Sequence, residues 1–424
     1  MAVHPIALCA RTRMETGSPK ATQKRVSIEQ LKPGMFIHDL GADWMSHGFL
    51  RSRFTLKDEQ QIDKIRECGI RELYIDVSRG LDVQDAPTRA EYERMIETDL
   101  HKVVATAPPR KVSLKEEMVR ARDIQARTRT VVKSMMQDVR MGASIALDTF
   151  EPLVEQMTES ILRNSGALIS LGQLKDVDDY TFQHCVSVST LMIALCRQLG
   201  LDADATREAG LGALLHDVGK MKTPLEVLNK PGKFTDEEFA IMKRHPEDGH
   251  AMLVDTPGIG EVPLLITLHH HERIDGSGYP HKLAAQTIPY SAQMAAIVDV
   301  YDAISSDRCY HKGMPPPEAV RKIFEWSKFH FNLELVQAFV RCIGIYPVGA
   351  LVRLESERLA VVTQQNEANL VQPVVRAFFD TKAKRPLFPE TVDLGKSLGH
   401  GGGDRIISHE DPAAWGVNPM AHMA

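Results

Sequence analysis

Histidine and aspartate side chains recur through the middle of this chain at intervals of about one helix plus a loop. Nine of the 17 histidines lie between His184 and His311. Within that window the candidates are separated by 32, 29, 25 and 28 residues, and they are His184, His216 with Asp217, His245, His270 with His271, and Asp299. Because neighbouring helices of a bundle can each present one side chain to a shared core, this spacing predicts a metal site inside a helical bundle.

The residue types in this set favour two transition-metal ions. Imidazoles with a minority of carboxylates suit Fe, Mn, Zn or Ni better than Ca or Mg. The adjacent His216 and Asp217 place two ligands about 100° apart on a helix, and a carboxylate can bridge two ions whereas an imidazole cannot. Asp299 lies in the apolar stretch MAAIVDVYDAISS, where burying a carboxylate is costly unless it is paired or coordinated. Two ions bridged by Asp217 are therefore expected.

A centre of this kind is suited to phosphodiester hydrolysis. Two ions about 3.5–4 Å apart activate water and neutralise charge on the phosphoryl group, so the expected nucleophile is a metal-bridging hydroxide. Lys220 follows His216 by four residues and is expected on the same helical face, where it can reach an anion held at the metals. Arg308 and Lys312 are candidate phosphate clamps, with a surface charge pair as the alternative.

Other polar residues near the set are assigned differently. His250 and His269 are predicted to pack or to support ligands, because only two of three consecutive residues can comfortably face one site. Asp302 either accepts a hydrogen bond from a ligand or packs between helices. The loop DGSGYP, from Asp275 to Pro280, supplies backbone that can approach a ligand closely and one aromatic ring.

Changes in composition and periodicity predict a mainly α fold with a small N-terminal α+β module, a helical connector and a small C-terminal β appendage. The segments are a disordered leader at 1–25, the α+β module at 26–84, a polar linker and connector helix at 85–149, a helical domain at 150–347, a β-rich appendage at 348–397 and a flexible tail at 398–424. Amphipathic periodicity extends to about residue 165, with only Pro152 interrupting it.

Composition narrows the class of protein. Lys and Arg total 51 against 56 Asp and Glu, a formal charge of −5, which disfavours a nucleic-acid polymer as partner. The six cysteines include no CxxC pair, which disfavours a zinc ribbon or a secreted disulfide framework and indicates a reducing compartment. No run approaches the ~20 apolar residues of a membrane span. We therefore expect a cytoplasmic protein.

Several motifs of this chain occur together, and in order, in one known family. They are YTFQH at 180–184, HDVGK at 216–220, HP at 245–246, HHERIDGSGYP at 270–280 and DVYDA at 299–303. Over about residues 150–347 the chain resembles the HD-GYP domain, a branch of the HD metal-hydrolase superfamily known for bacterial phosphodiesterases that degrade cyclic di-GMP. Residues 26–83 are similar to a small domain of unknown function often found ahead of HD-GYP domains.

The resemblance implies an HD-type helical bundle that hydrolyses cyclic di-GMP to pGpG, with GMP as a further product. It implies metal ligation by the seven histidines and aspartates of the first paragraph, with Fe or Mn ahead of Zn or Ni. Lys220 would contact the scissile phosphate, and Asp217 would share in catalysis as a ligand. The residues that would shape the substrate pocket are Gly276, Gly278, Tyr279 and Pro280. A homodimer or a GGDEF-type signalling partner is compatible with such a domain.

Two positions depart from the family pattern. Tyr180 stands where some members have a Glu and can hold a third metal, so two ions are expected. Cys309-Tyr310-His311 replaces a Pro-Tyr-Arg or Pro-Tyr-Lys sequence, which puts phosphate clamping at residue 311 in doubt. Two further hypotheses remain: a cyclic-dinucleotide sensor or interaction protein with little turnover, and a phosphodiesterase for another cyclic dinucleotide.

Overall fold

The computed structural model describes residues 22–41, 53–103, 112–173, 180–230, 232–307, 312–366, 369–397 and 402–423. The chain divides into two compact units, residues 1–95 and 96–424. Most of the predicted leader, residues 1–21, lies outside the described residues, and its last residues belong to the first strand. Among the described residues, no helix is both long enough and apolar enough to span a membrane.

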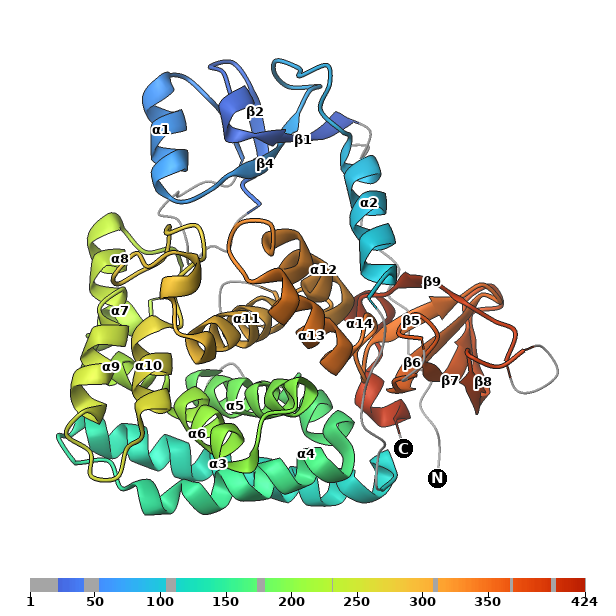
Figure 1. Ribbon diagram of the computed structural model, residues 1–424. Coiled ribbons are helices and arrows are strands. Elements are labelled where there is room, and N and C mark those ends of the chain that lie inside the picture. The colour runs from blue at the N-terminus through green and yellow to red at the C-terminus, as the bar shows by residue number, and fades with distance from the viewer. Residues whose placement is uncertain are drawn as a thin grey trace. The chain divides into compact units, whose positions relative to one another are not determined.

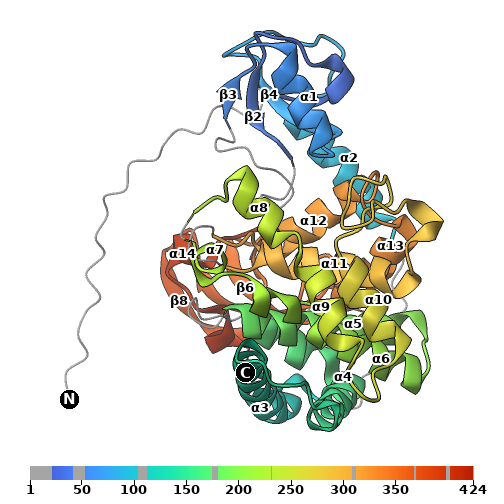
Figure 2. The same cartoon turned by 90° about the vertical axis from the view of Figure 1, so that its left-hand side faces the viewer.

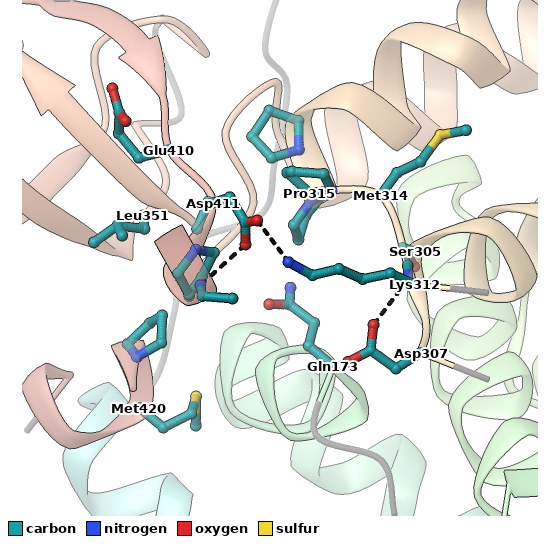
Figure 3. A pocket seen from close by; sticks show the side chains of 18 residues that line it. Gln173, Ser305, Asp307, Lys312, Met314, Pro315, Leu351, Glu410, Asp411 and Met420 are labelled. Carbon is teal, nitrogen blue, oxygen red and sulfur yellow. Dashed lines mark hydrogen bonds and ion pairs between the residues drawn. The ribbon is translucent and has the colours of Figure 1, made fainter. Parts of the chain in front are cut away.

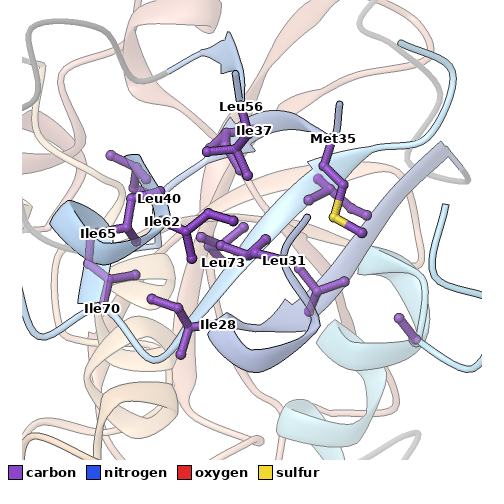
Figure 4. Packing of buried hydrophobic residues seen from close by; sticks show 13 residues of the cluster. Ile28, Leu31, Met35, Ile37, Leu40, Leu56, Ile62, Ile65, Ile70 and Leu73 are labelled. Atoms are coloured by element: carbon purple, nitrogen blue, oxygen red, sulfur yellow. The ribbon is translucent and has the colours of Figure 1, made fainter. Parts of the chain in front are cut away.

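The first unit is built on a four-stranded antiparallel sheet in the order β1-β4-β2-β3. Its strands are β1 (Gln23–Ser27), β2 (Phe36–Asp39), β3 (Phe54–Thr55) and β4 (Glu72–Asp76), with the short 3₁₀ helix η2 (Ile28–Gln30) after β1. Helix α1 (Glu59–Glu67) begins at Asp58, whose carboxylate accepts the amide of Gln61. Figure 4 shows Ile62 and Ile65 of α1 packed with Leu73 of β4, so the predicted α+β module has its own apolar core.

The segment after this sheet is more ordered than we predicted. Where we predicted a polar linker beginning at residue 85, the structure contains helix α2 (Arg89–His101). One face of this helix is apolar and buried, with a residue every four positions at Tyr92, Ile96 and Leu100. Burial of this narrow stripe stabilises a helix whose other residues are mostly polar. Residues 104–111, which include Pro108-Pro109, lie outside the described residues.

The second unit is mainly helical. Figures 1 and 2 show α3 lying along α4, with α5 and α6 packed on that pair. Its α-helices are α3 (Leu114–Arg140), α4 (Glu151–Gly172), α5 (Tyr180–Leu199), α6 (Ala203–Leu215), α7 (Leu225–Leu228), α8 (Asp236–Met242), α9 (His245–Leu253), α10 (Glu261–His269), α11 (Tyr290–Ser305), α12 (Pro316–Trp326), α13 (Leu333–Ile343) and α14 (Pro412–Trp415). Short 3₁₀ helices are η4 (Leu147–Thr149), η6 (Val218–Lys222), η7 (Ala285–Thr287) and η8 (Pro419–His422).

The predicted long connector helix is two helices. Helix α3 ends at Arg140, and Gly142 follows with a φ of +95°, a conformation that stops a right-handed helix. Pro152 does not interrupt a helix but lies in the first turn of α4, where a missing amide proton costs nothing. Because α3 packs along α4, it forms part of the helical domain rather than a free connector.

A buried ion pair joins α3 to α4. Glu117 is fully buried, and its carboxylate accepts hydrogen bonds from Arg163 Nε at 2.8 Å, Arg163 Nη2 at 3.0 Å and the Ser160 hydroxyl at 2.7 Å. Burial alone would raise the pKa of Glu117, but these hydrogen bonds outweigh it and lower the pKa.

We expect Arg163→Met to lower the free energy of unfolding by about 3 kcal/mol at pH 7, because the buried carboxylate then keeps only the Ser160 hydroxyl and the exposed Arg120, whose Nη1 is 3.6 Å away. The lowered pKa means that the pair stabilises the fold above the unfolded pKa of about 4.5 and that this contribution is lost as the pH falls further. Urea unfolding at pH 7 and pH 4 measures both effects. The exposed Arg122→Met on α3 is the control, and equal stability of the two variants at pH 7 would contradict the prediction.

A five-stranded antiparallel sheet closes the second unit, in the order β8-β7-β6-β5-β9. Its strands are β5 (Leu351–Leu354), β6 (Arg358–Gln364), β7 (Val374–Asp380), β8 (Arg385–Asp393) and β9 (Ile406–His409). The prediction of a flexible tail at 398–424 is wrong for residues 402–423, because β9 pairs with β5 through His409 and Val352. Ile406 packs against the sheet core, and pairing satisfies backbone groups that an open edge of β5 would expose.

Candidate metal centre

The seven predicted ligands come together from five parts of the helical domain. His184 lies on α5 and Asp299 on α11, while His245 begins α9. The other four flank helix ends: His216 and Asp217 follow α6, and His270 and His271 follow α10. All seven are no more than 4% exposed, so their polar atoms face one another rather than solvent.

Asp217 lies at the middle of this cluster with its two oxygens directed at different histidines. Oδ1 is 3.3 Å from His245 Nε2 and 4.0 Å from His270 Nε2. Oδ2 is 3.5 Å from His216 Nε2 and 3.7 Å from His184 Nε2. One carboxylate therefore faces two groups of imidazoles, which is the geometry that a bridging ligand requires.

The second carboxylate of the cluster belongs mainly to one of these groups. Asp299 Oδ1 is 3.0 Å from His184 Nε2 and 3.8 Å from His216 Nε2, while Oδ2 is 3.9 Å from His271 Nδ1. Ligand-type atoms within 4.8 Å of one another form the groups His184–His216–Asp299, His245–His270–His271 and His216–Asp217–His270. The first two are separate candidate positions for an ion, and the third shares residues with both.

Helix carbonyls fix the orientation of three of the imidazoles. His216 Nδ1 donates to Ala213 O at 2.8 Å, and His245 Nδ1 donates to Met242 O at 2.7 Å. His270 Nδ1 is 3.0 Å from Thr267 O. A carbonyl can only accept, so each Nδ1 carries the proton and each Nε2 presents a lone pair to the cluster.

Asp302 contacts the nitrogen of His184 that does not face the cluster. Its Oδ2 lies 2.6 Å from His184 Nδ1, on the side of the ring opposite the cluster. This contact resolves the two alternatives that the sequence left for Asp302, because a carboxylate in this place orients the imidazole and raises its basicity. The neighbouring Tyr180 ring stacks on His184 with centroids 5.7 Å apart.

Electrostatics hold four of these groups in the protonation states that a cation needs. Burial lowers the pKa of His245 to about 4, with the charge of Lys220 acting in the same direction. Burial likewise places the pKa of His270 and of His271 well below the ordinary value. For Asp217, burial would raise the pKa, but Lys220 and the surrounding histidines outweigh it and lower the pKa well below its usual range. Near neutral pH these three imidazoles are neutral and this carboxylate is ionised. His184 differs, because burial would lower its pKa but the hydrogen bonds to Asp299 and Asp302 outweigh burial and raise it.

Unsatisfied atoms indicate that the cluster fits metal ions. His216 Nε2, Asp217 Oδ1, His271 Nε2 and Asp299 Oδ2 are buried without a hydrogen-bond partner among the described residues. Leaving such groups unpaired is costly, whereas coordination would satisfy them. The imidazole-rich donor set matches transition metals.

Lys220 contacts the cluster, but it lies on a different element from the one we predicted. Helix α6 ends at Leu215, so Lys220 does not continue its face but lies on the 3₁₀ helix η6. Its Nζ is 2.5 Å from Asp217 Oδ2. Gly219 allows η6 to approach α9 closely, because a Cβ there would lie 2.0 Å from His245 O.

The loop after His271 forms one side of the cluster. The Tyr279 ring stacks on the His271 ring with centroids 4.7 Å apart. A Cβ at Gly278 would lie 2.4 Å from Arg273 N, so the loop folds tightly only with glycine there. Gly276, with a φ of +77°, and Pro280 flank this turn. The structure therefore brings Tyr279 of the predicted pocket residues into direct contact with a predicted ligand.

The predicted phosphate clamps are not joined to the cluster. Arg308 lies outside the described residues. Figure 3 shows Lys312 directed at Asp411, which precedes α14, and the two charged groups are 2.6 Å apart. They line a pocket of about 250 Å³ between the helical domain and the C-terminal segment. For Lys312, the alternative of a charge pair is the one observed.

Two residues near the centre had no role in our predictions. Glu272 accepts the amides of His281 at 2.8 Å and Leu283 at 3.0 Å, and so holds the loop in place. Arg140, the last residue of α3, donates to Lys220 O and Thr223 O, both at 3.1 Å. Glu272 follows two predicted ligands and could have been examined as their support, but nothing local in the sequence connects Arg140 to a loop 80 residues away.

Comparisons with known proteins match two families in this chain. Residues 156–335 match the family described as HD domain, and residues 23–150 match the domain of unknown function DUF3391. The cyclic di-GMP phosphodiesterase PA4108 of Pseudomonas aeruginosa is 43% identical over 94% of this chain and 95% of its own length. The cyclic di-GMP phosphodiesterase response regulator RpfG of Xanthomonas campestris is 31% identical over 62% of this chain and 71% of its own length.

One match among the solved structures covers most of this chain. It is Bd1817, a protein of Bdellovibrio bacteriovorus described as HDG"Y"P, and it covers 75% of this chain and 98% of its own chain. The TM-score is 0.45 and the sequence identity is 20%.

Proposed function

The chain belongs to the HD-domain family with an N-terminal DUF3391 domain, and from this membership we propose that it is a metal-dependent phosphodiesterase that hydrolyses cyclic di-GMP. The observation that carries the proposal is Asp217, whose two oxygens face separate histidine groups while Lys220 contacts one of them. The two relatives described above are named as cyclic di-GMP phosphodiesterases, whereas two shorter matches from Vibrio cholerae are named as 3'3'-cGAMP-specific phosphodiesterases.

The proposal includes two divalent ions held by residues of this chain. One would be held by His184, His216, Asp217 and Asp299, and the other by Asp217, His245, His270 and His271. Fe or Mn is proposed ahead of Zn or Ni. When bound, such ions supply Lewis acidity to the phosphoryl group and activate water.

Residues around the ligands would bind and orient the substrate. Lys220 carries a charge at the edge of the cluster, where it can neutralise a non-bridging phosphoryl oxygen as charge develops. Tyr279 and the turn from Gly276 to Pro280 would form one wall against the guanine or ribose. Asp302 keeps the His184 ring fixed during turnover. The products would be pGpG and, after a second hydrolysis, GMP.

Anaerobic product analysis tests this function, because Fe(II) centres oxidise in air. Protein loaded with Fe(II) or Mn(II) is incubated with cyclic di-GMP, and the products are separated by chromatography while metal content is measured on the same sample. We expect pGpG to appear at a rate proportional to metal content. Cyclic di-GMP that binds but stays intact over hours would instead support a sensor, and faster hydrolysis of cyclic GMP-AMP would change the assigned substrate.

The contact between α3 and η6 predicts a positioning role for Arg140. Removing its two hydrogen bonds in Arg140→Ala frees the carbonyls of Lys220 and Thr223, so we expect kcat to fall about tenfold with metal content and KM unchanged. Arg140→Lys should recover part of the loss. Steady-state kinetics with the exposed Arg127→Ala of the same helix as control measure the effect.

A structural defect would behave differently from lost positioning. In the Lys220→Ala background, Arg140→Ala should cause no further decrease in kcat, since the group it positions is already absent. A further tenfold decrease there would contradict the assignment.

A further inference from the structure

A second group of side chains has the composition and spacing of a metal site, and it includes His269, the first of three consecutive histidines. His269, Glu272 and His281 each offer one ligand-type atom, and these atoms lie within 4.8 Å of one another. His270 and His271 face the main cluster, whereas His269 Nδ1 lies 3.9 Å from Glu272 Oε1. Consecutive residues on a helix end point about 100° apart, so one of three neighbours must face elsewhere.

His269 has an unsatisfied nitrogen in this group. The residue is 7% exposed, and its Nδ1 is buried without a hydrogen-bond partner among the described residues. The His281 ring lies over it, with ring centroids 5.3 Å apart and planes inclined by 56°. A buried imidazole nitrogen without a partner is costly unless a donor or a cation satisfies it.

Glu272 retains the capacity to bind a cation. Its Oε1 accepts only the His281 amide and its Oε2 only the Leu283 amide among the described residues. A carboxylate oxygen has two lone pairs, so each oxygen keeps one. His281 is exposed, which gives an ion access and leaves room for water as a fourth ligand.

We propose that His269, Glu272 and His281 form a separate Zn²⁺ site that ties the loop after His271 to the end of α10. Two imidazoles, one carboxylate and one water are a common ligand set for zinc. Bonds of about 2.1 Å in tetrahedral geometry place ligand atoms roughly 3.4 Å apart. The 3.9 Å between His269 Nδ1 and Glu272 Oε1 is close to this value, and the exposed His281 side chain can move to complete the site.

The site would act on the loop rather than on phosphoryl chemistry. Glu272 already holds the amides of His281 and Leu283, so an ion on the same carboxylate would link these backbone positions to His269 on α10. Zn²⁺ binding would therefore slow opening of residues 273–283, the segment that carries Tyr279. This inference does not depend on the proposed substrate.

Zinc stoichiometry in matched variants tests the site. Equilibrium dialysis of the full chain against Zn²⁺ should give one ion fewer per chain in His281→Ala than in the unmodified protein, whatever number the main centre holds. His101→Ala, which removes an exposed histidine on α2, should bind as many ions as the unmodified protein. Equal stoichiometry in His281→Ala and the unmodified protein would overturn the proposal.

Hydrogen exchange provides a local readout of the same site. Zn²⁺ should slow exchange of the His281 and Leu283 amides in the unmodified protein, and this slowing should be lost in His281→Ala. Because His281 is exposed, its replacement should leave the fold intact even if His269→Ala does not fold. Exchange rates that respond to Zn²⁺ equally in both proteins would also overturn the proposal.

Discussion

Replacing Asp217 with alanine is expected to abolish metal loading and hydrolysis of cyclic di-GMP together. Asp217 is the residue whose two oxygens face both histidine groups, with His245 Nε2 at 3.3 Å on one side and His216 Nε2 at 3.5 Å on the other. Asp299 approaches the second histidine group only at His271 Nδ1, 3.9 Å from its Oδ2, whereas Asp217 Oδ1 is 3.3 Å from His245 Nε2. Removal of Asp217 takes a ligand from both proposed ions.

The size of the effect follows from what the ions supply. Lewis-acid stabilisation is worth several kcal/mol, and each 1.36 kcal/mol is a factor of ten, so kcat should fall by at least about three orders of magnitude. Metal content per chain should fall in parallel. Both are measured on the same anaerobic preparation, by elemental analysis and by pGpG formation.

Two further variants separate this effect from general damage. Asp255→Ala removes an exposed carboxylate and should change neither quantity. Asp302→Asn alters the group behind His184 rather than a ligand, and should reduce metal affinity about 10- to 100-fold without abolishing loading. If Asp217→Ala kept its full metal content, Asp217 would not be the shared ligand.

The sequence was sufficient to predict that these seven side chains come together, because each member lies on or next to a predictable helix. His184 and Asp299 lie within strongly apolar helices, where a buried polar residue is conspicuous. His216 and His270 each follow the last turn of a helix, which allows their Nδ1 atoms to bond with carbonyls of that turn. The positions of these residues on helices could therefore be predicted from the local hydrophobic periodicity.

The sequence was insufficient where structure depends on distant contacts. Lys220 reaches Asp217 because η6 is a 3₁₀ helix pressed against α9 at Gly219, which a continued α-helical face does not describe. Strand β9 exists because it pairs with β5, and the four residues IISH carry little strand signal alone. Arg140 reaches η6 only because α3 packs beside it, and no local pattern shows this.

Lys220→Ala is expected to separate chemistry from metal binding. Its ammonium lies 2.5 Å from Asp217 Oδ2 and helps to lower the pKa of that carboxyl. In the assembled site the same charge would neutralise the phosphoryl group, and losing such stabilisation costs about 2–4 kcal/mol, or roughly a 30- to 900-fold decrease in kcat. Metal content should not fall, because the variant removes a cation that competes with metal ions for Asp217.

Three lysine variants decide whether Lys220 acts on the chemical step or on metal binding. Lys222→Ala changes an exposed lysine on the same 3₁₀ helix and should retain full activity. Lys220→Arg keeps the charge but not the compact ammonium, and should recover part of the rate. If Lys220→Ala lost metal to the same extent as Asp217→Ala, the lysine would act by maintaining the metal centre, because a purely electrostatic role on the substrate leaves metal content intact.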